Sequence, residues 1–195
     1  MLVLQYSLGF IAVTLTFYGF IPYIRSIHKG DVKPHVFSWV IWALTTFIVF
    51  FAQWVSGGGA GALSILVSAL VTCYIALVAY LKRGKINITK ADWFFFLTAI
   101  LSLPLWFFFS SPLYAVIILT VADILGFLPT IKKIYHDPFS ENLWFYIIFM
   151  VRNIVVCFAL EDKNLTTVLF PASIAVVCLF VVNLIVFRRQ GVKNH

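Results

Sequence analysis

Apolar stretches of helical length alternate with short polar segments along the whole chain. A helix that crosses a bilayer needs about 20 mainly apolar residues, and seven stretches come close to this length. The pattern therefore predicts seven transmembrane helices and leaves little chain for a soluble domain. The predicted spans are residues 2–23, 36–54, 60–81, 93–109, 113–135, 143–160 and 165–187.

One segment occurs twice in the chain. Residues 19–27, Gly-Phe-Ile-Pro-Tyr-Ile-Arg-Ser-Ile, return as residues 126–134, Gly-Phe-Leu-Pro-Thr-Ile-Lys-Lys-Ile. A second proline and an aromatic run follow each copy, and each copy ends an apolar run. Internal repeats of this kind set the architecture of a fold, so the chain is expected to use one helical unit twice.

The repeat also fixes how the two units are oriented. A basic loop follows the first helix of both units, so both must face the same way across the membrane. Three helices carry the chain from one side of the membrane to the other. One extra span is therefore needed so that the second unit begins on the same side as the first. Residues 93–109 match neither unit and supply this span. We therefore expect an all-α membrane protein with seven transmembrane helices, in which two parallel three-helix bundles, residues 1–85 and 112–195, are joined by a linker helix in residues 86–111.

Composition agrees with this prediction. The chain is 63% hydrophobic and 11% charged, with a mean hydropathy of +1.03. A soluble domain is about half apolar and about a quarter charged. No basic residue precedes the first span and no small-residue cleavage pattern follows it, so it is expected to be retained and not removed as a signal peptide.

The net charge of +7 does not indicate a nucleic-acid partner, because the basic residues mark one membrane face. Only Lys163, beside Glu161 and Asp162, falls in a loop on the other face. The positive-inside rule then predicts an outside N-terminus and a cytoplasmic C-terminus. The basic residues of the predicted inner face are Arg25, Lys29, Lys33, Lys82, Arg83, Lys85, Lys90, Lys132, Lys133, Arg188, Arg189 and Lys193.

No catalytic residue, metal site or cofactor is predicted. Cys73, Cys157 and Cys178 fall inside spans without metal-ligand spacing, which is typical of packing residues. The glycine-rich segment 56–61 lacks the lysine of a phosphate-binding loop. Paired acids, a histidine cluster, or a nucleophile with a base are not found at intramembrane depth, so enzymatic activity is not expected.

A stripe of polar and aromatic residues follows one face of the span 36–54. Its members recur at spacings of three and four, and the second unit has polar and aromatic residues at matching positions. A packing seam is one interpretation. We favour the interpretation that the stripe is the wall of a cavity. The polar groups of Thr46 and Gln53 gain no favourable interaction from lipid, and aromatic faces stack well on planar or sugar-like rings. The candidate solute-binding residues of the stripe are Trp39, Trp42, Thr46 and Gln53 in the first unit and Tyr146 and Asn153 in the second.

Away from the ends of the spans, Asp123 is the only acid and Arg152 the only base. Counted at about 1.5 Å per residue, both come to a similar depth near the middle of the membrane. An ion pair between them would relieve much of the penalty for a lone buried charge, about 3 kcal/mol. Three roles stay open: a structural clamp, a site for a charged solute such as an amino acid or other zwitterion, and proton coupling through Asp123. The first unit has Thr16 where the second has Asp123.

Pro22 and Pro129 take equivalent places near the ends of the first helix of each unit. Proline removes a backbone N–H and its ring clashes with the preceding turn, so it ends or kinks a helix. Helix termination is one interpretation of both residues, and a hinge on which the inner half of each helix swings is the other.

This pattern resembles the SWEET and PQ-loop superfamily of small membrane transporters, in their seven-helix form. The resemblance rests on two three-helix units, a lone linker helix, Pro22 and Pro129, and the Ser38-Trp39 and Trp42 opening of the second helix. It implies that the two units enclose a central cavity and that the substrate is a small polar solute. The KDEL receptor is similar in architecture, so the resemblance implies the fold more firmly than the ligand.

The sequence thus predicts a transporter that moves a sugar, amino acid or vitamin by alternating access, either as a facilitator or coupled to protons. The alternative is a ligand-sensing receptor of the KDEL-receptor type without net transport. The expected partners are the solute, the lipid bilayer and, for the coupled case, a proton. Because two units are already joined in one chain, both a monomer and a homo-oligomer are compatible with it.

Overall fold

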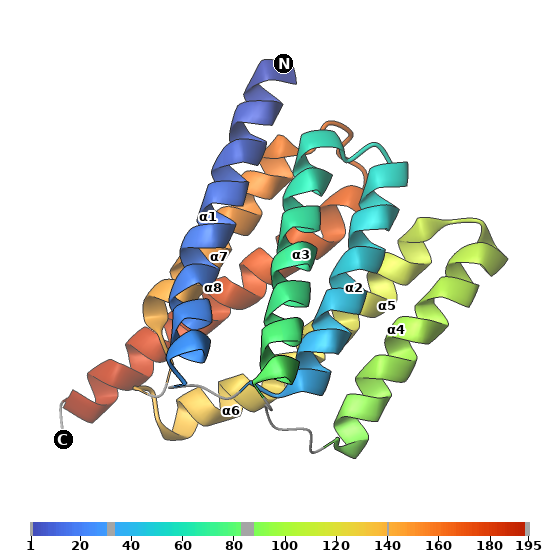
Figure 1. The fold of residues 1–195 in the computed structure, drawn as a ribbon. Coiled ribbons are helices and arrows are strands. Elements are labelled where there is room, and N and C mark those ends of the chain that lie inside the picture. Colours follow the sequence, from blue (N-terminus) through green and yellow to red (C-terminus); the bar gives the residue numbers. More distant parts are fainter. Residues whose placement is uncertain (1, 31–33, 83–87, 140, 194–195) are drawn as a thin grey trace.

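The computed structural model describes residues 2–30, 34–82, 88–139 and 141–193, except for the side chains of Pro129, Lys133 and residues 191–193. Every regular element in these ranges is a helix (Figure 1). The helices are α1 (Leu2–Lys29), α2 (Val36–Val55), α3 (Gly59–Leu81), α4 (Lys90–Phe109), α5 (Pro112–Gly126), α6 (Leu128–His136), α7 (Leu143–Ala159) and α8 (Leu165–Lys193).

Six segments are long and apolar enough to cross a bilayer, with α5 and α6 taken together, and α7 is a shorter apolar helix. The chain is therefore an all-helical integral membrane protein, as the sequence predicts. Lys33, Arg83 and Lys85, which support the predicted orientation, and the predicted unit boundary at residues 85–86 lie outside the described residues.

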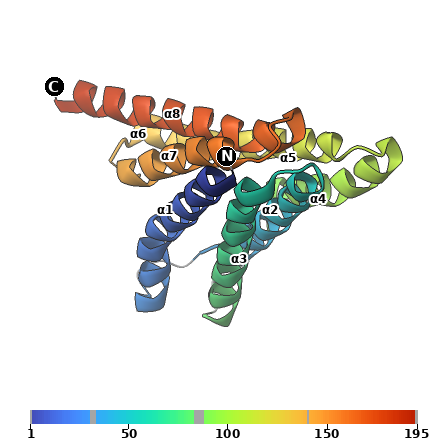
Figure 2. The same cartoon turned by 90° about the horizontal axis from the view of Figure 1, so that it is seen from above.

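The helices form two groups that pack across each other. α3 lies against both α1 and α2, and α8 lies against α5, α6 and α7. Figure 2 shows α5 to α8 along one side of the molecule, with α1, α2 and α3 on the other. α7 contacts α1 and α3, while α2 contacts α5 and α8. These contacts between the groups place the deepest part of the core in the middle of the molecule.

α4 lies at the edge of the molecule against α5 and α2 (Figures 1 and 2). It begins with a capping box, in which Thr89 Oγ1 accepts from the Asp92 N–H at 3.2 Å and the Thr89 N–H donates to Asp92 Oδ2 at 2.8 Å. Only Ala99 and Ser102 are buried along its length, and Phe107 and Phe108 are 78% and 81% exposed. In a membrane these exposed faces contact lipid.

The basic residues gather at one end of the molecule. The last turns of α1, α3 and α8 and the first turn of α4 lie at this end, and the N-terminus lies at the opposite end (Figure 1). Lys82 Nζ donates to the carbonyls of Ile27 and His28 in the last turn of α1, at 3.2 and 2.5 Å. Arg189 donates to the carbonyls of Pro138 and Glu141 at 3.0 and 2.9 Å. A cation at a helix C-terminus is favoured by the helix dipole, so the Lys82 contacts stabilise the end of α1, while Arg189 holds the loop between α6 and α7.

Two helix boundaries differ from the sequence prediction. α1 runs through Pro22 to Lys29, so this proline does not end the helix. The span predicted for residues 113–135 is instead broken at Phe127, between α5 and α6. Pro129 then falls in the first turn of α6. Backbone N–H groups of a first turn have no acceptor within the helix, so the missing N–H of proline costs no hydrogen bond there. The two equivalent prolines therefore lie in different backbone settings.

Candidate functional site

A cavity of about 260 Å³ lies where the two helix groups meet. All helices except α4 contribute to its wall. The wall is rich in aromatic residues, and Asp123 and Arg152 are the charged residues among its described side chains. The predicted site residues on this wall are Trp39, Trp42, Thr46, Asp123, Tyr146, Arg152 and Asn153.

Gln53 is the predicted site residue that the structure does not bring to this cavity. It is fully buried between α2 and α8, and its Nε2 donates to the Thr167 carbonyl at 2.8 Å. Its Oε1 has no hydrogen-bond partner among the described residues. Gln53 therefore links α2 to α8 and does not line the cavity.

Arg152 is held by neutral oxygens from three helices. Its Nε donates to Thr16 Oγ1 on α1 at 3.1 Å, and its Nη1 donates to Asn153 Oδ1 at 3.0 Å. Its Nη2 donates to the Ser64 carbonyl at 2.8 Å and to Ser68 Oγ at 2.5 Å, both on α3. The guanidinium is only 3% exposed, so these bonds fix its position at the junction of the two helix groups.

Asp123 and Arg152 do not form the ion pair that their similar expected depths made feasible. The only ion pair within 4.0 Å in the described part of the chain joins His35 and Asp92. Arg152 instead binds Thr16, the residue that occupies the Asp123 position in the first unit. The neighbouring helices, and not position along the helix alone, decide which residue the guanidinium reaches.

Asp123 makes no hydrogen bond or ion pair with any residue that the structure describes. It projects from the last turn of α5 and is partly accessible, because it lines the cavity. A carboxylate in such surroundings lacks the donors that normally replace its lost water shell. Asp123 is therefore the least satisfied polar group of the cavity wall.

Aromatic rings form a continuous layer on one side of the cavity. Trp39 contacts Trp42 edge to face with ring centroids 5.0 Å apart, and it also contacts Phe20 at 6.4 Å. Phe20 contacts Phe149 at 5.1 Å, and Phe149 stacks on Phe145 at 4.5 Å. This layer gives the cavity flat apolar surfaces from α1, α2 and α7.

Several wall residues were missed by the stripe analysis. Phe20 and Phe127 both line the cavity and are equivalent in the two copies of the repeated segment. The repeated segment could therefore have identified both phenylalanines as candidate wall residues. Ser68 and Thr72 on α3 also line the wall, but nothing in their sequence setting distinguishes them from packing residues of a small-residue helix.

A larger vestibule of about 1210 Å³ adjoins the cavity. The two share five aromatic residues, Phe20, Trp39, Trp42, Phe145 and Tyr146. The vestibule is lined by the second half of α1, including Pro22, and by the first turns of α2 and α7. It therefore lies toward the basic end of the molecule, and aromatic side chains separate it from the cavity.

The opposite end is closed by two loops that bind each other. We call them the outer latch: residues 56–60 between α2 and α3, and residues 160–164 between α7 and α8. The Asp162 and Glu161 N–H groups donate to the carbonyls of Gly57 and Gly58 at 2.9 and 3.4 Å. The Ala60 N–H donates to Glu161 Oε1 at 3.2 Å. Asn164 Nδ2 adds a bond to the Ser56 carbonyl at 2.8 Å.

The glycines make this latch possible. Gly57 and Gly59 have φ of +82° and +51°, a region that other residues rarely adopt. A Cβ at Gly57 would collide with the Asp162 carboxylate, and one at Gly59 would collide with Glu161. The glycine-rich segment therefore serves close packing of two loops at one end of the molecule.

His35, Ser38 and Asp92 lie together where α2 meets α4. His35 Nδ1 is 2.8 Å from Ser38 Oγ and 3.9 Å from Asp92 Oδ1, and Ser38 Oγ donates to Asp92 at 3.4 Å. In a catalytic triad the two imidazole nitrogens face the nucleophile and the acid separately. Here one nitrogen faces both, so the cluster joins α2 to α4 and does not have triad geometry.

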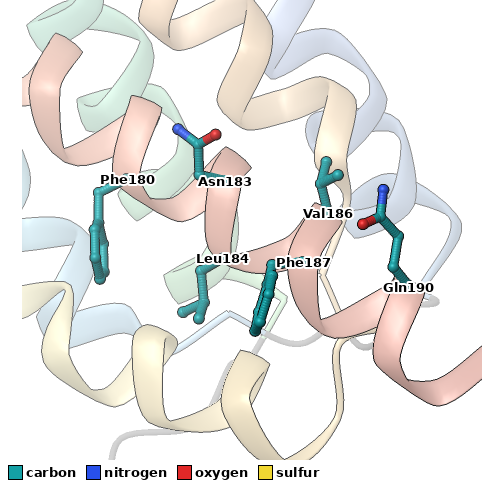
Figure 3. A pocket seen from close by; sticks show the side chains of 6 residues that line it. All are labelled: Phe180, Asn183, Leu184, Val186, Phe187 and Gln190. Carbon is teal, nitrogen blue, oxygen red and sulfur yellow. The ribbon is translucent and has the colours of Figure 1, made fainter.

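A separate shallow groove runs along α8 (Figure 3). Its polar side chains are Asn183 and Gln190, and the others, Phe180, Leu184, Val186 and Phe187, are apolar. Asn183 is exposed, and its Nδ2 donates to the Leu179 carbonyl of its own helix at 2.8 Å. None of the described residues that line the groove is ionisable, so it is a weaker candidate than the central cavity.

Comparisons with models of protein families, with characterised proteins and with solved structures find no match to this chain. The geometry of the cavity, its vestibule and the outer latch is therefore the basis for a functional conclusion.

Proposed function

We propose that the protein is a transporter that moves a small polar solute across the membrane by alternating access. The observation that carries this proposal is the central cavity, which contains an acid and a base, adjoins a vestibule toward one end and is closed at the other. Intramembrane ionisable residues that face a cavity mark a substrate or ion pathway. A binding site between two units with one closed end is what alternating access requires.

The proposed architecture is two parallel three-helix units, α1–α3 and α5–α8, joined by α4. The repeated segment supports it, and so does the packing order, since the last long helix of each group lies against the other two. Phe20 and Phe127, equivalent in the repeat, both reach the cavity. The resemblance to the SWEET and PQ-loop transporters is consistent with this arrangement.

The vestibule lies at the basic end, which the positive-inside rule assigns to the cytoplasm. The conformation described is then inward-facing, with the N-terminus outside and the outer latch closed. Closing the vestibule requires the second half of α1 and the start of α7 to approach each other. Pro22, inside α1, and the break between α5 and α6 before Pro129 are the proposed hinge points.

Counterflow in proteoliposomes tests this function. Vesicles loaded with one unlabelled solute at a time, from a panel of sugars, amino acids and vitamins, are expected to accumulate the labelled form of at least one of them. Protein-free vesicles are the control. Absence of counterflow across the panel would contradict the proposal, and saturable binding without counterflow would indicate a receptor.

Replacing Trp42 by alanine is expected to weaken binding of the transported solute about fivefold, since a stacking surface is worth about 1 kcal/mol. Trp42 contributes its ring to both the cavity and the vestibule. Binding to the detergent-purified variant is the measurement. Trp54→Ala is the matched control, because Trp54 lies on the same helix and on neither wall. Equal affinities of the two variants would remove Trp42 from the site.

Replacing Gln53 by leucine is expected to leave solute affinity unchanged within about twofold and to change stability by less than about 1 kcal/mol. The variant loses the bond to the Thr167 carbonyl but also removes the unpaired Oε1. Asn153→Leu, on the cavity wall, is the contrast and is expected to weaken binding. A large loss of affinity in Gln53→Leu alone would show that Gln53 faces the solute space.

A further inference from the structure

We infer that the solute is a zwitterion with an apolar or aromatic body, whose ammonium group binds Asp123 and whose carboxylate group binds Arg152. This inference rests on the proposed transport function and specifies its substrate class.

The first argument is the state of the two charges. Asp123 lacks a partner among the described residues, and every hydrogen-bond acceptor of Arg152 in that set is a neutral oxygen. The two side chains line one cavity without forming an ion pair. The cavity therefore separates a negative and a positive group that have no counter-ion on the wall.

The second argument compares the solutes that such a wall can accept. A neutral sugar leaves both charges uncompensated, and a simple cation or anion compensates one while leaving a net charge in the membrane. A lone charge is costly in that environment. A zwitterion compensates both groups and adds no net charge, so it is the class that lowers the energy of the occupied site most.

The third argument is the hydrogen-bonding capacity of Arg152. A guanidinium has five N–H donors, and the described contacts use four of them. One N–H on Nη1 is left to meet a carboxylate oxygen without breaking the bonds that hold the side chain. Because those bonds come from α1, α3 and α7, the donor is already in position before the solute arrives.

The fourth argument is the shape and lining of the rest of the cavity. Its volume of about 260 Å³ lies below the range of about 300–1,000 Å³ typical of drug-sized ligands, so a solute of amino-acid size fits better than a nucleotide or disaccharide. Trp39, Phe145 and Phe149 offer flat apolar faces to the body of the solute. An ammonium group also gains from nearby aromatic faces through cation–π attraction.

The test uses solutes that differ in one charge at a time. The purified wild-type protein is exposed to L-phenylalanine, to its methyl ester, which lacks the anion, to N-acetyl-L-phenylalanine, which lacks the cation, and to glucose. L-Leucine and L-serine extend the panel to smaller bodies. At least one of the free amino acids is expected to raise the unfolding midpoint and to drive counterflow in proteoliposomes. Its ester and its N-acetyl derivative are expected to bind at least about tenfold more weakly.

Asp123→Asn supplies the second measurement. It removes the charge but keeps the size of the side chain, and it is expected to abolish the preference for the free amino acid over its N-acetyl derivative. The preference over the methyl ester, which depends on Arg152, is expected to remain. Counterflow of glucose without response to any amino acid would overturn the zwitterion inference and leave the transport proposal intact. No counterflow of any solute would overturn both.

Discussion

Replacing Arg152 by alanine is expected to lower the free energy of unfolding by about 3 kcal/mol, the largest loss among single substitutions in the cavity wall. The substitution removes three hydrogen bonds that join α7 to α1 and α3, together with one to Asn153 on α7 itself, and leaves a void at their junction. The unfolding midpoint of the detergent-purified protein is the measurement. Lys132→Ala, which removes an exposed cation of α6, is the control and is expected to change the midpoint little.

Two further variants separate the charge of Arg152 from its geometry. Lysine keeps the charge but cannot reach three helices with one planar group, so Arg152→Lys is expected to recover only part of the lost stability. Ser68→Ala removes one acceptor and is expected to cost about 1 kcal/mol. Combined with Arg152→Ala it is expected to add little, because both remove the same bond. A stable Arg152→Met variant would contradict the role of this residue as a link between helices.

The sequence predicts the helical membrane fold because long apolar stretches have few alternatives in lipid. Trp39, Trp42 and Thr46 were predicted together because spacings of three and four place residues on one helical face. The prediction failed at Gln53, on the same face but farther along α2, because α8 covers that part of the helix. Periodicity specifies a face, and only the neighbouring helices decide whether the face borders a cavity or another helix.

The partners of Arg152 were beyond sequence reasoning for the same reason. Its position along α7 gives only an expected depth, and its partners Thr16 and Ser68 come from segments far away in the chain. The prolines show a second limit. Pro22 and Pro129 sit in nearly identical sequences, yet α1 continues past the first and the helix breaks before the second. Packing around each segment therefore overrides a local signal that both share.

Replacing Gly59 by alanine is expected to open the outer latch and shift the protein toward an outward-facing state. A Cβ at this position collides with Glu161, and a φ of +51° costs an L-residue about 1–2 kcal/mol. A shift of about 1.4 kcal/mol between the two conformations changes their ratio about tenfold. The latch loops bind each other chiefly through backbone groups, so a small displacement of residues 56–60 removes several bonds together.

Labelling of a cysteine in the cavity measures this shift. In a background without the three native cysteines, Thr46→Cys is expected to react about tenfold faster with a membrane-impermeant reagent added outside when Gly59→Ala is present. Glu161→Gly removes the side chain that the new Cβ meets and is expected to reverse part of the change in the double variant. An unchanged rate of labelling from outside in Gly59→Ala would show that these loops do not close the solute path. The cavity would then be as well shielded from that side after the loops are disrupted as before.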